Sequence, residues 1–203
     1  KKINHFILLN RVTRYTFRCE FYPMTGANKY LKEFCKSYYD ELNNGISKKT
    51  FLKLHPADND SYWKNYKYYK NISNSKLEKK EGLKEVFENS KLITCLYPET
   101  TFSECIYNNI PTILLYPKNF YERNKKFTNV INKLKDAKIL FYNPIEAAKH
   151  INKIWYDVDK WWNSQNTKNA IKIFKKNILG INENDKDKKY WLDFVEYSYK
   201  DHL

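Results

Sequence analysis

The sequence predicts an α/β fold built around a doubly wound, mostly parallel β-sheet. Short apolar runs recur along the 203 residues, and helical patterns of apolar residues lie between them. The runs are continuously apolar rather than alternating, which is typical of strands buried on both faces of a parallel sheet. Because strands that alternate with helices form βαβ units, we expect a Rossmann-like arrangement, with extra helices at the carboxyl end.

Five short apolar runs are the predicted strands. They are His5–Asn10, Thr50–His55, Lys91–Leu96, Thr112–Tyr116 and Lys138–Tyr142. Sheets of this class bind ligands outside the carboxyl ends of their strands. The turns that follow these runs are therefore the places to look for a functional site.

Helical spacing marks the connections between the predicted strands. Apolar residues from Tyr30 to Leu42 repeat at i, i+4, and shorter patterns occupy Leu83–Phe87 and Phe127–Leu134. These patterns predict one amphipathic helix in each connection, with its apolar face against the sheet.

The clearest helix start is at Asn143-Pro144. Asn is a favoured N-cap, Pro suits the first helical position, and Glu146 at the third position comes close to completing a capping box. An apolar face follows that includes Trp155 and Trp162. We interpret Trp155, Trp161 and Trp162 as residues that pack a crossover helix rather than as a site. Two further helices are predicted near Thr167–Ile178 and Lys188–Tyr199.

Composition and charge narrow the classes of function. Hydrophobic residues make up 42% of the chain, which excludes a disordered protein, and no apolar run approaches the roughly 20 residues that span a bilayer. The net charge of +14 suggests a nucleic-acid-binding protein, but 33 of the 37 basic residues are Lys, dispersed over every segment. Such dispersion is typical of a solvated surface.

Cysteine and histidine spacing gives no support for disulfides or a metal. Cys19, Cys35, Cys95 and Cys105 form no CxxC pair, so we expect buried free thiols. The four His residues form neither an i, i+4 pair nor an HExxH motif, and the four Gly residues form no Gly-rich phosphate loop. No metal site and no tightly bound cofactor are predicted.

His55 is the first candidate site residue. It ends a predicted strand and is followed by Pro56, which stops the strand and restricts the turn. An imidazole at the carboxyl end of a strand can donate a hydrogen bond to a phosphate or a ribose. The alternative is a His that satisfies a local backbone group, and position alone leaves the two equally weighted.

The second candidate is the turn after the third predicted strand, Tyr97-Pro98-Glu99-Thr100-Thr101. Thr100 or Thr101 can cap the helix that follows, with Ser103 or Glu104 near its third position. A simple N-cap needs only one hydroxyl. The functional hypothesis is that the helix start and the spare hydroxyls bind a phosphate or carboxylate, while Glu104 binds ribose hydroxyls.

The third candidate is an Arg cluster after the first predicted strand. Three of the four Arg residues lie within residues 11–18, and Arg14 and Arg18 fall in the loop before the helix that begins near Asn28. The guanidinium group suits phosphate or carboxylate; the alternative is a surface ion-pair network. All three candidates follow predicted parallel strands, so their shared chemistry indicates a nucleotide-sugar pocket.

Several of these segments resemble a known family. They are Ser90–Ile93, Glu99–Glu104, Asn109–Thr112, Trp155–Ser164 and Arg14–Arg18. Together they resemble the leptospiral-type transferases of bacterial surface-carbohydrate biosynthesis, over roughly residues 5 to 180. His55-Pro56 and Thr100-Thr101 also resemble the His-Pro and Ser/Thr motifs of enzymes that use CMP-activated sugars, such as Kdo transferases and sialyltransferases.

The resemblance implies a glycosyltransferase with a GT-B fold, of which this chain is the carboxyl-terminal, nucleotide-sugar-binding half. Residues 1–163 would be that domain, and residues 164–203 a helical extension packed on it or on an amino-terminal domain. A CMP-sugar such as CMP-Kdo would be the donor, and a glycan or lipid-linked molecule the acceptor. Glu99 and His55 are the candidate catalytic residues.

The apolar run Phe6–Leu9 near the start is too short for the hydrophobic region of a signal peptide, so we expect a cytoplasmic protein. The many Lys residues would favour peripheral association with the inner face of the cell membrane. Two other classes of function remain as alternatives. A basic nucleic-acid-binding module would need its basic residues on one face, and no specific nucleic-acid partner is expected. A non-catalytic interaction domain would have its pocket filled by side chains.

Overall fold

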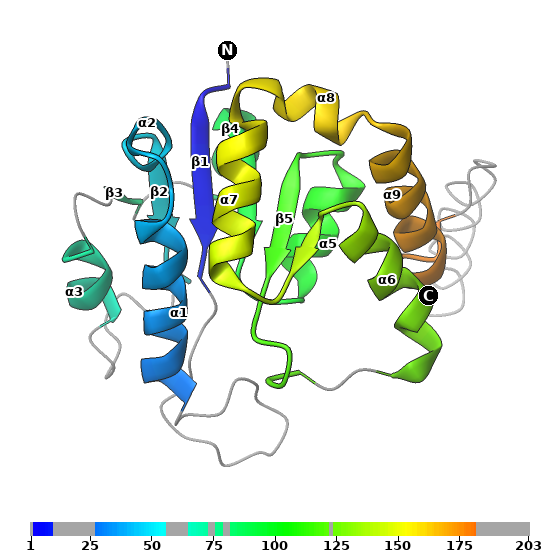
Figure 1. Ribbon diagram of the computed structural model, residues 1–203, viewed down its shortest axis with the longest axis horizontal. Helices are drawn as coiled ribbons and strands as arrows, with labels where there is room; N and C mark the ends of the chain where they lie inside the picture. Colours follow the sequence, from blue (N-terminus) through cyan, green and yellow to red (C-terminus); the bar gives the residue numbers. More distant parts are fainter. Residues whose placement is uncertain are drawn as a thin grey trace, which may run out of the picture.

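Six parallel strands form the centre of the molecule in the computed structural model (Figure 1). The structure describes residues 2–9, 27–55, 65–72, 76–78, 82–121 and 124–181. The strands are β1 (Asn4–Leu8), β2 (Thr50–Lys53), β3 (Lys76–Glu78), β4 (Ser90–Cys95), β5 (Thr112–Leu115) and β6 (Leu140–Phe141). Their order is β3-β2-β1-β4-β5-β6, and every pairing is parallel, so the doubly wound Rossmann-like fold is confirmed.

All five predicted strands are present, each shifted or shortened by a few residues. The strand β3 was not predicted. It has three residues, Lys-Leu-Glu, of which one is apolar, so it carries no run that local patterning could detect. It pairs only with β2 and therefore forms an edge of the sheet.

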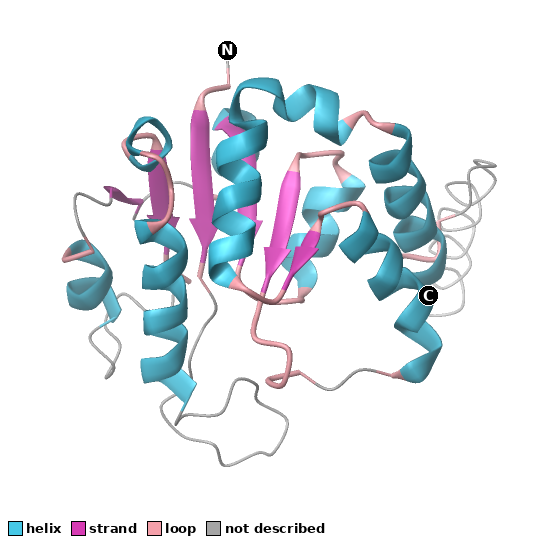
Figure 2. Ribbon diagram, in the orientation of Figure 1, coloured by secondary structure: helices cyan, strands magenta, loops and turns pink. Residues whose placement is uncertain are grey.

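Helices cover both faces of the sheet (Figure 2). On one face, α1 (Asn28–Asp40) and α7 (Pro144–Ile154) pack on a core that includes Ile7, Leu52 and Leu92. On the other, α4 (Leu83–Asn89), α5 (Thr100–Tyr107), α6 (Thr128–Asp136) and α9 (Gln165–Ile178) pack on a core that includes Phe6 and Ile93. Neighbouring residues of one strand thus enter opposite cores, which explains why the strands are apolar throughout.

The remaining helices are short. They are α2 (Asn44–Ser47), α3 (Asn65–Lys70), η3 (Lys125–Phe127), η4 (Trp155–Asp157) and α8 (Val158–Trp162). The apolar segment after Asn143 is therefore not one continuous helix, because α7 passes through the turn η4 before α8 begins. The Asn143 cap is confirmed: its Oδ1 accepts hydrogen bonds from the N–H groups of Ile145 at 2.9 Å and Glu146 at 3.2 Å.

Two tryptophans of α8 donate hydrogen bonds to the connections that precede β5 and β6. Trp162 Nε1 donates to Asn109 Oδ1, and Trp161 Nε1 donates to the carbonyl oxygen of Ala137, both at 3.0 Å. Asn109 and Ala137 precede β5 and β6, so these bonds lie at the amino ends of the strands, opposite the candidate site. The interpretation of Trp155, Trp161 and Trp162 as packing residues is confirmed.

The helix α9 packs against α5 and α6, and Phe174 lies edge-on to Phe102 with ring centroids 5.3 Å apart. The helix near Thr167–Ile178 is thus confirmed, whereas the one predicted at Lys188–Tyr199 lies outside the described residues. The proposed domain boundary at residue 163 stays a prediction. Ala170, Ile171 and Phe174 of α9 are buried in the same core as the sheet.

Candidate functional site

The candidate site lies at the carboxyl edge of the sheet, where the strand order changes direction. From β1 the chain proceeds outward to β2 and β3, then crosses to β4 and proceeds outward to β5 and β6. The carboxyl ends of β1 and β4 therefore border the crevice in which folds of this class bind ligands. Arg14 and Arg18 follow β1 in the sequence but lie outside the described residues.

The structure brings His55 and Glu99 together at this edge. His55 follows β2 and Glu99 follows β4, so the two residues come from strands on either side of β1. Both residues are exposed overall, yet burial of the carboxyl group raises the pKa of Glu99, and the nearby charge of His55 partly opposes that rise. Two predicted site residues far apart in the sequence are thus close enough for the charge of one to act on the other.

The helix α5 begins at the same edge, and its start differs from the prediction. Glu99 is the N-cap residue, with an extended backbone, and no side chain forms a cap hydrogen bond. The prediction that Thr100 or Thr101 caps the helix was therefore wrong: they are its first two residues. The N–H groups of Phe102 and Ser103 bond to the carbonyl oxygen of Glu99 at 3.1 and 3.4 Å.

The first turn of α5 consequently presents the N–H groups of Thr100 and Thr101 without acceptors from the helix itself. These groups and the helix dipole create a positive potential at the crevice. Thr100 is exposed there, whereas the Thr101 hydroxyl accepts a hydrogen bond from Tyr97 Oη at 3.3 Å. Burial raises the pKa of Tyr97 to about 12, so this tyrosine stays protonated and supports the turn.

Ser103 and Glu104 lie farther from the edge. They are half-buried and follow the first turn of α5, about 5 Å along its axis. Burial raises the pKa of the Cys95 thiol, and the charge of Glu104 raises it further, which places Glu104 near the end of β4. Thr100 therefore lies at the edge of the sheet, whereas Ser103 and Glu104 lie farther along α5.

Sequence reasoning missed a polar cluster inside the sheet, towards the amino ends of β1 and β2. His5 is fully buried; its Nδ1 lies 3.1 Å from Thr50 Oγ1 and its Nε2 lies 2.9 Å from Thr94 Oγ1. Tyr38 Oη is 2.7 Å from Thr94 Oγ1 and 3.3 Å from His5 Nε2. The cluster joins the three neighbouring strands β1, β2 and β4. The available signal was a His and two Thr residues inside apolar strands.

Other chemical features of the described residues are few. Cys35, Cys95 and Cys105 are buried free thiols, as predicted, and Cys19 lies outside the described residues. Within the described ranges, no group of three His, Cys, Asp or Glu residues is arranged to hold a metal ion. Nor does any described helix combine the length and the apolar character that crossing a bilayer requires.

Comparison with known proteins identifies the family of the chain. No curated protein and no solved structure matches it. A family model does: the model described as LIC12162 family transferase matches residues 1–194, nearly the whole chain and all the strands and helices described above. Since the match includes every predicted site residue, the site lies within the part that the family shares. The chain therefore belongs to the LIC12162 family of transferases.

Proposed function

We propose that this transferase is a glycosyltransferase of bacterial surface-polysaccharide synthesis, with the chain forming the donor-binding half of a GT-B fold. Its donor would be a nucleotide-activated sugar, with a CMP-sugar such as CMP-Kdo favoured, and its acceptor a glycan or lipid-linked molecule. The observation that carries the proposal is the first turn of α5. It has no side-chain cap and lies beside His55 and Glu99 at the switch point of the sheet.

An anion is the ligand that suits this helix start. A phosphate would accept hydrogen bonds from the N–H groups of Thr100 and Thr101 and would be stabilised by the helix dipole. His55, across the crevice, would donate a further hydrogen bond to a phosphate or ribose oxygen. Arg14 and Arg18, from the segment after β1, would neutralise phosphate or sugar carboxylate. Ser103 and Glu104 would contact the ribose.

Catalysis would follow from stabilising the nucleotide as it leaves. Negative charge grows on the phosphate as the glycosidic bond to the sugar breaks, and fixed N–H groups and cations lower the free energy of that transition state. Glu99 is the candidate general base for the acceptor hydroxyl. Burial raises its pKa, which makes it a stronger base than an ordinary carboxylate.

The partners of this function are a nucleotide-sugar and a surface-glycan precursor. An acceptor attached to a lipid would bring the protein to the cytoplasmic face of the cell membrane, where the many Lys residues would favour peripheral association with anionic lipids. The nucleotide itself is expected to bind without a lipid, because the groups that contact it all belong to this chain.

The proposal is tested by nucleotide binding. Thermal shift and calorimetry with CMP, CDP, UDP and GDP should show that at least one nucleotide stabilises the chain, with CMP strongest. His55→Ala and Arg14→Ala should each weaken that binding about tenfold, as expected for the loss of a hydrogen bond to a charged group. Lys48→Ala is the matched control, because Lys48 is exposed and lies before β2, at the opposite edge of the sheet.

Failure of all four nucleotides to stabilise the chain would contradict the proposal. A response that is equal in wild type and the His55→Ala and Arg14→Ala variants would place the nucleotide elsewhere. Salt-sensitive binding of DNA or RNA without any nucleotide response would instead favour a nucleic-acid-binding module.

A further inference from the structure

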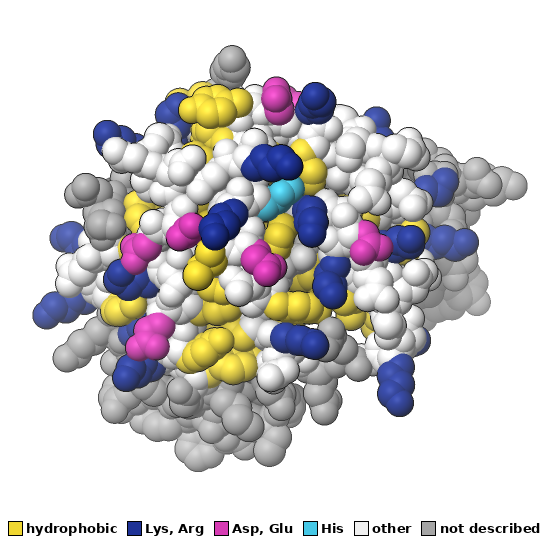
Figure 3. Space-filling model, in the orientation of Figure 1, with side chains coloured by type: hydrophobic (Ala, Val, Ile, Leu, Met, Phe, Trp, Pro, Cys, Tyr) yellow, Lys and Arg dark blue, Asp and Glu magenta, His cyan; other side chains and the backbone are white. Residues whose placement is uncertain are grey.

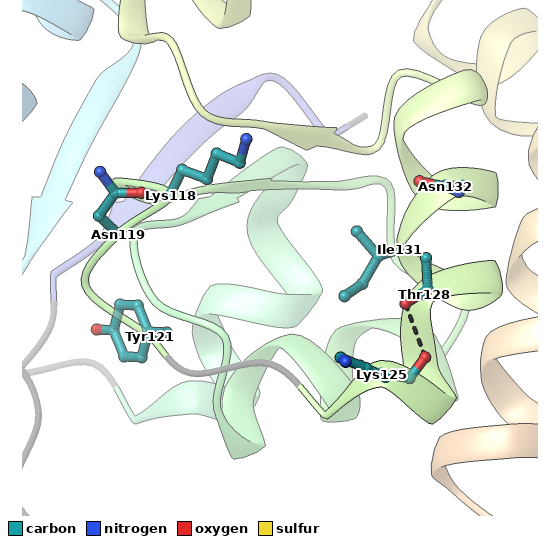
Figure 4. Close-up of a pocket in the computed structure, with 7 residues that line it drawn as sticks. All are labelled: Lys118, Asn119, Tyr121, Lys125, Thr128, Ile131 and Asn132. Atoms are coloured by element: carbon teal, nitrogen blue, oxygen red, sulfur yellow. Dashed lines mark hydrogen bonds between the residues drawn. The ribbon is translucent and has the colours of Figure 1, made fainter.

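A pocket lies at the carboxyl end of β5, outside the site described above. Its volume is about 520 Å³, and it lies between the segment that follows β5 and the start of α6 (Figure 4). Pockets of a few hundred cubic ångströms are the usual size for small-molecule ligands. None of the residues that line it was singled out from the sequence.

The charge of the pocket favours an anion. Lys118, from the segment after β5, and Lys125, from η3, both line it. No carboxylate is among the described residues that line it, and neither lysine takes part in an ion pair among the described residues. Two ammonium groups around one concavity raise the local concentration of anions because their potentials add.

The neutral polar groups suit a ligand rich in hydroxyl groups. Asn119 and Asn132 line the pocket on opposite sides, and each amide offers both donors and an acceptor (Figure 4). Thr128 Oγ1 donates its hydrogen to the carbonyl oxygen of Lys125 at 2.7 Å, which leaves the oxygen able to accept. Sugar hydroxyls both donate and accept, so this mixture matches them, whereas a simple anion needs donors alone.

The pocket also has an apolar wall. Ile131 is half-buried in it, and the ring of Tyr121 is held edge-on against the buried ring of Tyr116, with centroids 5.3 Å apart. The C–H face of a pyranose ring can pack on such surfaces while its hydroxyls meet the polar groups. Inorganic phosphate would leave this wall uncovered.

We propose that this pocket, between the segment after β5 and α6, binds an anionic monosaccharide unit, that is, a sugar that carries a carboxylate or a phosphate. The strand β5 pairs directly with β4, after which Glu99 and Thr100 follow, and paired strands lie about 4.8 Å apart. A sugar in the pocket is thus within reach of a nucleotide at the switch point. The role of the sugar as a substrate rests on the proposed function, but its binding does not require a nucleotide.

The test is a set of NMR titrations of the wild-type chain with four probes. Glucuronate carries a carboxylate, glucose 6-phosphate carries a phosphate, glucose is neutral, and inorganic phosphate has no ring. We expect one or both anionic sugars to bind at least about tenfold more tightly than glucose and inorganic phosphate, because binding needs both the charge and the ring. The better of the two identifies the anionic group.

Two variants locate the binding. Lys118→Ala combined with Lys125→Ala should weaken the anionic sugar about tenfold or more. The control is Lys126→Ala, because Lys126 is exposed, does not line the pocket, and has its ammonium group over the ring of Phe127 at 4.9 Å. All three lysines are exposed, so both variants should keep the wild-type thermal midpoint. The selectivity among the four probes tests the inference without any variant.

Equal binding of glucose and the anionic sugars, no binding of any probe, or unchanged affinity in the double variant would each overturn the inference. A CMP titration of the same samples separates it from the proposed function. Anionic-sugar binding without CMP binding would contradict the nucleotide site and leave the pocket standing. CMP binding without anionic-sugar binding would contradict the pocket and leave the nucleotide site standing.

Discussion

At the scale of single residues, the best-defined polar chemistry lies in the core rather than at the surface. The ring of His5 is hydrogen-bonded through both nitrogens and lies edge-on to Tyr38 and Trp155, with centroids 6.1 and 6.3 Å apart. Burial lowers the pKa of His5 from 6.5 to about 3, so the ring is neutral and serves as one donor and one acceptor. We interpret it as a connector that fixes the spacing of β1, β2 and β4 inside the sheet.

This burial predicts a pH dependence of stability. The pKa of His5 is lowered in the folded chain, so the unfolded chain binds a proton first as the pH falls below 6.5. The stabilisation is therefore present above pH 6.5 and is lost as the pH falls towards 3, by about 2 kcal/mol at pH 5. Urea unfolding of the wild type at pH 7 and pH 5 measures this loss.

The matched variant is His5→Gln, which should be less stable at pH 7 but should lose less stability on going to pH 5. His150 contributes in the same direction, because burial and then Lys138 and Lys153 lower its pKa to about 4, and its contribution remains in that variant. An equal loss in wild type and His5→Gln would show that His5 does not carry the effect.

At the scale of elements, the start of α5 is the informative feature. Among the described helices, α7 is capped by the side chain of Asn143 and α9 by that of Ser164, whereas α1, α6 and α8 have no side-chain cap hydrogen bond. The helix α5 has Glu99 at its N-cap and likewise no such bond. What distinguishes α5 is its place: its uncapped start lies at the switch point of the sheet, where folds of this class bind ligands.

We therefore predict that Glu99→Ser stabilises the free protein by about 0.5–1 kcal/mol, because a Ser hydroxyl can accept from the N–H groups of the first turn. The same change should weaken nucleotide binding, since the new cap competes with phosphate for those groups. Urea unfolding and calorimetry with CMP measure the two effects. Glu88→Ser, at an exposed position within α4, is the control and should not gain stability; a Glu99→Ser variant less stable than wild type would contradict the prediction.

At the scale of the whole molecule, the net charge of +14 is carried mainly by Lys residues. On the face that Figure 3 shows, the described Lys side chains are interspersed with Asp and Glu and with uncharged surface. Such a face attracts any polyanion weakly through its overall field.

This distribution predicts weak and non-specific binding of DNA. Anisotropy of a labelled 20-base-pair duplex should show affinity that falls by about tenfold or more between 50 and 200 mM salt, independent of base sequence. Excess CMP should not displace the duplex, because the duplex would contact the dispersed lysines and not the crevice. Sequence-selective binding that persists at 200 mM salt, or displacement of the duplex by CMP, would contradict this view of the surface.

The amino-acid sequence by itself determined the fold class, five of the six strands, the helices that bury an apolar face and the Asn143 cap of α7. Each of these depends on residues within a few positions of one another, where spacing and capping chemistry act directly. It also indicated that residues after the strands, such as His55 and Glu99, carry the site. The prediction that Thr100 or Thr101 caps α5 was wrong because a hydroxyl at either position fits the sequence pattern of an N-cap equally well.

Only the tertiary structure decided which of these residues meet. The strand order places β1 between β2 and β4, and this order alone brings His55 beside Glu99 and joins His5 to Thr94, which lies 89 residues away. The pocket beside α6 likewise depends on how the segment after β5 lies against a helix. Local periodicity carries no information about strand order, because the pairing of distant strands is set by the packing of the whole core.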